Sequence, residues 1–174
     1  AGTARSLRLK TPEGMDTRPT TDRIKETLFN MLQPYLGDAL FVDLFSGSGG
    51  IGIEALSRGA RHAYFVENEK RAIACIQENL QFTRLADRAT VLKTDVLSAL
   101  YGIHEREADI VFMDPPYDCG HEERALAVLG EMPWVTENTL IVIETSLRAD
   151  LSFLENTGFS VEKEKRYKTN RHVF

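Results

Sequence analysis

The sequence predicts an α/β fold with a mostly parallel sheet and helices on both faces. Three observations support this prediction. Short apolar runs, typical of buried strands, alternate with longer amphipathic segments along the chain. A glycine-rich turn joins the first of these runs, Leu40–Leu44, to the segment expected to form the next helix. Acidic residues stand directly after several of the runs, at the strand ends where open parallel sheets bind their ligands.

The expected elements follow from the apolar spacing. Strands are expected at residues 6–10, 40–44, 63–66, 89–92, 109–113, 139–143, 159–167 and 170–174. A first helix is expected to begin near Thr20 or Thr21 and to be ended by Pro34 and Gly37. Further helices are expected at 51–58, 71–82, 122–129 and 151–156. Gly59 is expected to end the second helix in a left-handed conformation. We expect one domain over residues 1–174, in which 1–36 form a strand and helix extension to a core at about 37–174.

Charge is distributed unevenly along the chain. The net charge is −5, yet residues 1–25 carry six basic and three acidic side chains, and residues 161–174 carry five and two. Each end is therefore net positive, and the middle is strongly acidic. A basic surface at the ends could attract phosphate groups, because this attraction depends on local charge. Composition alone favours charged ends that are merely solvated.

The remaining composition indicates a cytoplasmic protein without a metal. Cys75 and Cys119 have no metal spacing and are too few for a disulfide framework. The four histidines are scattered and expected on the surface. No apolar run is long enough to span a membrane, and no signal peptide is visible. The chain starts with alanine and ends on an apolar pair, which suggests that both ends are trimmed.

The glycine-rich turn has the spacing of a nucleotide-binding loop. Gly47, Gly49 and Gly52 fit G-x-G-x-x-G after a strand and before a helix. In this arrangement the backbone approaches a ligand closely, and N–H groups at the helix start point toward it. Asp43 precedes the glycines and is expected to order the loop or to reach an ammonium group of the ligand. The spacing by itself is weak evidence, since dinucleotide-binding proteins share it.

Four acidic residues occupy corresponding positions at the ends of expected strands, and they predict a ligand cleft lined by carboxylates. They are Asp43, Glu67, Asp95 and Asp114. Glu67, which lies 15 residues after Gly52, is placed to accept hydrogen bonds from two ribose hydroxyls. For Asp95, a plain helix cap and a ligand contact are about equally supported.

The segment Asp114-Pro115-Pro116-Tyr117 is the most specific signal. Two prolines fix the backbone and leave nearby carbonyls free to accept. A carboxylate and a carbonyl can together hold an exocyclic amine with its lone pair turned toward an electrophile. Tyr117 can stack on a base that has left its helix. The alternative is a rigid turn, which is less consistent with the neighbouring glycine loop.

These motifs, over about residues 40–145, resemble those of S-adenosylmethionine-dependent amino-methyltransferases. With the stretch Arg18–Asn30, the chain resembles the RsmD family. The resemblance implies a Rossmann-like class I methyltransferase fold with a seven-stranded sheet. It also implies S-adenosylmethionine as cofactor, and the N2 amine of a guanine in 16S ribosomal RNA, free or in the small-subunit particle, as substrate. A monomer that binds no membrane is expected.

The resemblance assigns roles to individual residues, with Asp95 facing the adenine amine and Val96 backing its ring. The implied catalytic residues are Asp114, Pro115, Pro116 and Tyr117. The implied cofactor-binding residues are Thr20, Thr21, Asp43, Phe45, Ser46, Gly47, Ser48, Gly49, Glu67, Asn68, Asp95, Val96 and Asp114. The expected RNA-binding residues are the basic side chains of the amino-terminal part, Arg5, Arg8, Lys10, Arg18 and Arg23.

Two other readings of the site residues stay open. The first is another amino-methyltransferase, acting on adenine N6 or on protein glutamine; enzymes acting on DNA adenine usually carry an added recognition region, for which 174 residues leave no room. The second is a nucleotide-binding module or an NAD-dependent dehydrogenase. It would explain Gly47, Gly49, Gly52 and Glu67, but it gives no role to Asp114 and its prolines.

Overall fold

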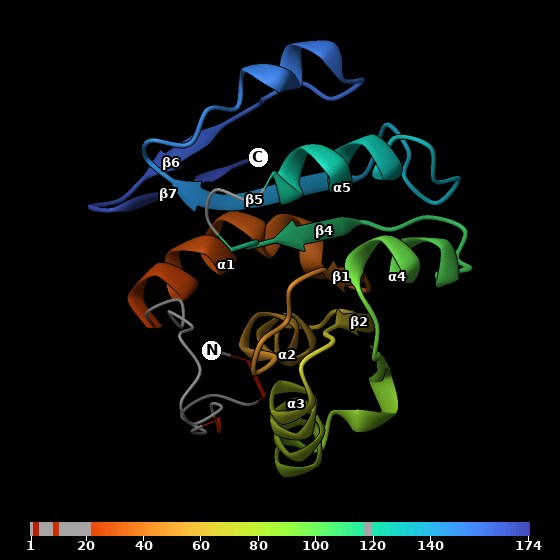
Figure 1. Cartoon of the computed structure of the whole chain (residues 1–174). Coiled ribbons are helices and arrows are strands. Elements are labelled where there is room, and N and C mark those ends of the chain that lie inside the picture. Colours follow the sequence, from red (N-terminus) through yellow and green to blue (C-terminus); the bar gives the residue numbers. More distant parts are fainter. Residues whose placement is uncertain (1, 4–8, 11–21, 117–119) are drawn as a thin grey trace.

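The computed structural model describes residues 2–3, 9–10, 22–116 and 120–174, and its centre is a seven-stranded sheet (Figure 1). The strand order is β3-β2-β1-β4-β5-β7-β6. The first five strands pair in parallel, whereas β7 runs antiparallel to both of its neighbours. The sheet is therefore mixed, with its antiparallel part at one edge. The strands are β1 (Leu40–Asp43), β2 (His62–Val66), β3 (Ala89–Leu92), β4 (Ile110–Met113), β5 (Leu140–Ser146), β6 (Glu164–Arg166) and β7 (Asn170–Val173).

Helices cover both faces of this sheet, as expected. They are α1 (Asp22–Leu36), α2 (Gly50–Ser57), α3 (Lys70–Thr83), α4 (Val96–Gly102) and α5 (His121–Leu129), with 3-10 turns η1 (Ala86–Arg88) and η2 (Ser152–Asn156). Apolar residues of α1, α2 and α3 share one core cluster with Phe41 and Phe112. Those of α4 and α5 share a second cluster with Val42 and Val111. Alternate residues of a strand point to opposite faces of the sheet, and both faces are covered at β1 and β4. Every residue of these two strands is therefore buried, which explains their continuous apolar sequences.

Several element boundaries differ from the expectation. Pro34 lies inside α1, which continues to Leu36, although proline has no N–H to donate to the carbonyl of the preceding turn. The strand expected over residues 159–167 is only β6, three exposed residues paired with the short β7. Leu9 and Lys10 lie in no strand, and the rest of the strand expected at 6–10 is outside the described residues, as are Thr20 and Thr21. Gly59 has a φ of 109°, which confirms its left-handed conformation after α2.

Candidate active site

The loop between β1 and α2 is shaped by its glycines. Gly47 and Gly49 have φ angles of 55° and 86°, which favour glycine. At Gly52, a Cβ would lie 2.4 Å from the ring of Phe65, so only glycine lets α2 pack this closely on β2. A Cβ at Gly47 would meet nothing within 4 Å. The first turn of α2 therefore packs on β2 at Gly52, while the tip of the loop at Gly47 borders open space.

Glu67 connects the end of β2 to the tip of this loop. Its Oε1 accepts a hydrogen bond from the backbone N–H of Gly47 at 2.9 Å, and its Oε2 accepts one from the N–H of Glu69 at 3.1 Å. The next residue, Asn68, is exposed. Each carboxylate oxygen can accept more than one hydrogen bond, so Glu67 retains capacity for hydroxyl groups of a ligand.

Asp43, at the end of β1, is a buried carboxyl group with no hydrogen-bonded partner for either oxygen among the described residues. Burial, with the charge of Glu67, raises the pKa of Asp43 to about 7. The hydroxyl of Ser46 and the N–H groups of Phe45 and Gly52 act in the opposite direction, but none of them has the geometry of a hydrogen bond to the carboxyl oxygens. Ser46 itself donates to the backbone carbonyl of Asp43 at 3.0 Å. A buried carboxyl without a partner suits a ligand that brings positive charge.

Asp114 follows β4 and lies beside β5. It is half-buried, Pro115 is buried, Pro116 is exposed, and Tyr117 is outside the described residues. Burial is the largest cause that raises the pKa of Asp114 to about 9. The charge of Glu144, a hydrogen bond with Glu144 and the charges of Asp43 and Glu122 contribute to the same rise. The sheet thus brings the predicted Asp43 and Asp114 close enough to influence each other, and Asp43 likewise interacts with Glu67.

Asp95 is the N-cap of α4. Its Oδ1 accepts from the N–H of Ser98 and its Oδ2 from the hydroxyl of Ser98, both at 2.9 Å. These bonds lower the pKa of Asp95, so its carboxylate stays charged. The structure thus shows the capping role, and a contact of Asp95 and Val96 with an adenine stays a prediction.

The remaining predicted residues are only partly described. Phe45 is half-buried against His121, with 5.6 Å between ring centroids. Arg23 is exposed on the first turn of α1, and Ser48 is half-buried in the glycine loop. The predicted residues outside the described part are Arg5, Arg8, Arg18, Thr20, Thr21 and Tyr117.

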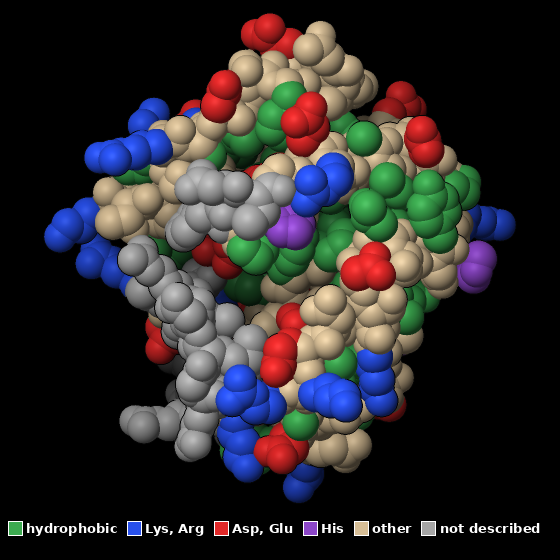
Figure 2. Space-filling model, viewed as in Figure 1, with side chains coloured by type: hydrophobic (Ala, Val, Ile, Leu, Met, Phe, Trp, Pro, Cys, Tyr) green, Lys and Arg blue, Asp and Glu red, His purple; other side chains and the backbone are tan. Residues whose placement is uncertain are grey.

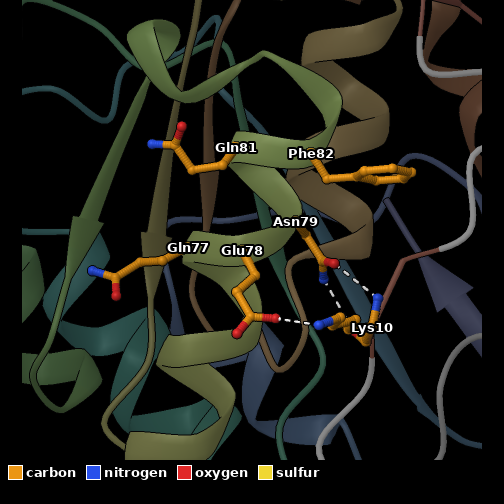
Figure 3. A pocket seen from close by; sticks show the side chains of 6 residues that line it. All are labelled: Lys10, Gln77, Glu78, Asn79, Gln81 and Phe82. Atoms are coloured by element: carbon orange, nitrogen blue, oxygen red, sulfur yellow. Dashed lines mark hydrogen bonds and ion pairs between the residues drawn. The ribbon is translucent and has the colours of Figure 1, made fainter.

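Lys10 is held against α3 by Asn79 (Figure 3). The side chain of Asn79 accepts from the N–H of Lys10 at 2.8 Å, and its NH₂ group donates to the carbonyls of Lys10 and Ser48, both at 2.9 Å. The Lys10 ammonium forms an ion pair with Glu78 at 2.8 Å. Beside this contact lies a pocket of about 550 Å³, lined by Lys10, Gln77, Glu78, Asn79, Gln81 and Phe82. Asn79 thus links the amino-terminal part of the chain to the glycine loop.

The described surface is uneven in charge. Figure 2 shows a hollow near the middle of this face, bordered by acidic and hydrophobic side chains, with Lys and Arg gathered toward the β6–β7 end and around α3. The exposed basic residues of the carboxyl-terminal end are Lys163, Lys165, Arg166 and Lys168. Among the described residues, no group of three His, Cys, Asp or Glu side chains could hold a metal ion. None of the described helices has both the length and the apolar character needed to cross a membrane.

Three polar residues missed by the sequence analysis continue in a row from Asp114: Glu144, then His172, then Tyr167. Glu144 is a fifth acid directly after an apolar run, so the rule that identified the other four would have included it. His172 was expected on the surface, but it is fully buried, and its ring lies between Glu144 and Tyr167. No local pattern indicates the contact of His172 with Glu144, since these two residues are 28 residues apart in sequence.

Comparison with known proteins gives consistent matches over the whole chain. The family described as "Conserved hypothetical protein 95" matches residues 1–174. "Ribosomal RNA small subunit methyltransferase D" of Haemophilus influenzae is 37% identical over 94% of this chain and 86% of its own, and the Escherichia coli K12 protein of the same name is 35% identical over 94% and 81%. The solved structure of yhhF from Escherichia coli has 32% identity and a TM-score of 0.82, over 99% of this chain and 93% of its own.

Proposed function

The chain belongs to the RsmD family of methyltransferases, and on this premise we propose that it methylates the exocyclic N2 amine of a guanine in 16S ribosomal RNA. S-adenosylmethionine is the methyl donor. The observation that carries the proposal is the position of Asp114 and its two prolines at the end of β4, beside Asp43 and the glycine loop. Among the readings left open by the sequence, only an amino-methyltransferase gives all of these residues a role.

The chain offers suitable groups for the methyl donor. When bound, S-adenosylmethionine supplies a methyl group on a positively charged sulfonium. The buried Asp43, which lacks a hydrogen-bonded partner among the described residues, favours positive charge in this part of the site. Glu67 is placed to accept hydrogen bonds from ribose hydroxyls while it still holds the N–H of Gly47. Phe45, Ser46, Ser48, Gly49 and Asn68 complete the proposed cofactor site, together with Asp95 and Val96 at the adenine.

Asp114 and the carbonyl at the prolines orient the reacting amine. The lone pair of an exocyclic amine is delocalised into its base, so the amine is a poor nucleophile. Two acceptors on its hydrogens turn this lone pair toward the methyl carbon, and alignment of this kind supplies much of the rate. For this role Asp114 must be a carboxylate, whereas its surroundings favour the protonated form. The positive charge of the donor opposes that effect, so ligand binding itself helps to charge Asp114.

Ribosomal RNA is the proposed partner, bound through basic side chains. Exposed Lys and Arg residues at the β6–β7 end lie on the face with the central hollow (Figure 2). Arg5, Arg8, Arg18 and Arg23 are proposed to add to this surface, with Lys10. We further propose that the protein acts as a monomer in the cytoplasm, where ribosomal subunits are assembled.

The test is methyl transfer in vitro from labelled S-adenosylmethionine to 16S RNA and to small-subunit particles, followed by mass analysis of the nucleosides. N2-methylguanosine at one site is the expected product. N6-methyladenosine would instead support an adenine enzyme. Calorimetric titration with S-adenosylhomocysteine and with NAD gives an independent check, because a dehydrogenase would bind NAD.

A further inference from the structure

Three polar residues form one row across the sheet beside the proposed amine site. In the parallel pairing of β4 with β5, Met113 is opposite Ile143, so the next residues, Asp114 and Glu144, are neighbours. In the antiparallel pairing of β5 with β7, Glu144 is directly opposite His172. The fold therefore fixes the sequence Asp114–Glu144–His172 across three strands, independently of any ligand.

Hydrogen bonds connect this row from end to end. Asp114 and Glu144 share a side-chain hydrogen bond. Glu144 Oε1 lies 2.6 Å from His172 Nε2, and His172 Nδ1 lies 3.1 Å from the hydroxyl of Tyr167. With Nε2 carrying the hydrogen, the imidazole donates to Glu144 and accepts from Tyr167, and both ring nitrogens are satisfied.

Removing the polar side chains of this row from water costs free energy. Glu144 and His172 are 7% and 0% exposed, and the imidazole is surrounded by the rings of Phe112, Tyr167 and Phe174, with centroids 5.1 to 6.4 Å away. A buried carboxylate beside a histidine gives weak net stability, because removing both from water offsets most of their attraction. The other carboxyl groups facing Asp114 are Asp43 from β1 and Glu122 from α5.

We propose that Glu144 and His172 are positioning residues that set the orientation and protonation state of Asp114 in the methyl transfer proposed above. Glu144, held in place by His172, shares a proton with Asp114 in the ligand-free protein. With the positively charged donor bound, the shared proton moves to Glu144, so Asp114 becomes the carboxylate that the amine requires and accepts a hydrogen bond from the protonated Glu144. The inference rests on the proposed function for its purpose, but the shared proton is a property of the protein alone.

The first test is a pH profile of single-turnover methyl transfer for the wild type, Glu144→Gln and Ile143→Val. Removing the charge of Glu144 lowers the pKa of Asp114, so the rising limb of the profile should move to lower pH by at least about one unit. Ile143→Val is the matched control, because it removes one buried methylene from the same strand and changes no charge. Its profile should keep the wild-type midpoint. An unshifted midpoint in Glu144→Gln, with only a lower rate, would overturn the proposal.

The second test does not depend on activity. In protein with ¹³C-labelled aspartate side chains, the Asp114 carboxyl signal, identified by its loss in Asp114→Asn, is followed during a pH titration. The expected result is a titration well above that of ordinary aspartates in the wild type and a lower one in Glu144→Gln. Equal midpoints in the two proteins would contradict the shared proton. If the wild type methylates no ribosomal RNA but this shift is present, the proposed function fails while the pairing stands.

Discussion

Glu67 Oε1 and the backbone nitrogen of Gly47 lie 2.9 Å apart, so the end of β2 holds the tip of the glycine loop. The same side chain accepts from the N–H of Glu69 at the start of α3. In the ligand-free protein, Glu67 therefore orders both segments that border its carboxylate. A residue expected only to contact the ligand also shapes the surface on which the ligand rests.

Glu67→Ala is expected to weaken S-adenosylmethionine binding by about 1–3 kcal/mol, because buried hydroxyl groups and the Gly47 N–H lose their acceptor. Glu67→Gln keeps one acceptor oxygen and should lose less. Isothermal calorimetry measures both variants. An affinity equal to that of the wild type in Glu67→Ala would remove Glu67 from the cofactor site.

The parts of this fold that could be predicted are those set by local pattern. β1 and β4 are buried on both faces, so their apolar runs marked them in the sequence, and the acids at their ends marked the site. The extent of β6 could not be predicted, because its three residues are exposed and only pairing with β7 defines them. The contact of His172 with Glu144 depends on which strands become neighbours, and the sequence alone does not give that order.

Asn79→Ala should loosen both the amino-terminal part and the glycine loop, since one amide group holds Lys10 and Ser48. Loss of three hydrogen bonds from a buried side chain predicts a destabilisation of about 1–3 kcal/mol and weaker S-adenosylmethionine binding. Thermal unfolding and calorimetry measure the two effects. Gln77→Ala, in the same pocket, is the control and should change neither. Equal cofactor affinity in Asn79→Ala would show that the link does not affect the loop.

The basic ends are predicted to form the RNA surface. Charge reversal of Arg5 and Arg8 to glutamate, with Lys10→Gln so that no acid is placed beside Glu78, should weaken RNA binding. It should also flatten the dependence of binding on salt, because fewer phosphate contacts release fewer ions. Cofactor affinity should stay as in the wild type. A salt slope identical to that of the wild type would mean that the charged ends are merely solvated.

The raised pKa of Asp43 predicts that the folded protein loses stability as the pH rises. Its pKa is raised from 3.8 to about 7 in the folded state, so the folded protein binds more protons than the unfolded chain between these values. Its contribution to stability is therefore complete below about pH 4 and is lost as the pH rises through about 7. Asp43→Asn, which cannot ionise, should unfold at a higher temperature than the wild type at pH 8, and this advantage should shrink at pH 5. Thermal unfolding at both pH values measures it, and an advantage that does not depend on pH would contradict a raised pKa.

Asp114 provides the sharpest test of the proposed chemistry. If it orients the guanine amine, Asp114→Ala should lower single-turnover methyl transfer about 10²-fold or more, because a charge-assisted hydrogen bond and the alignment it enforces are lost together. The affinity for S-adenosylmethionine should fall far less than the rate, since Asp114 is proposed to contact the base and to interact with the donor only through its charge. Asp114→Asn still offers one acceptor oxygen and can donate to Glu144, so it should retain more activity than the alanine variant. Rates and cofactor affinities are measured on the same protein samples. Near-normal turnover in Asp114→Ala, or a loss of cofactor binding that matches the loss of rate, would exclude the amine-orienting role.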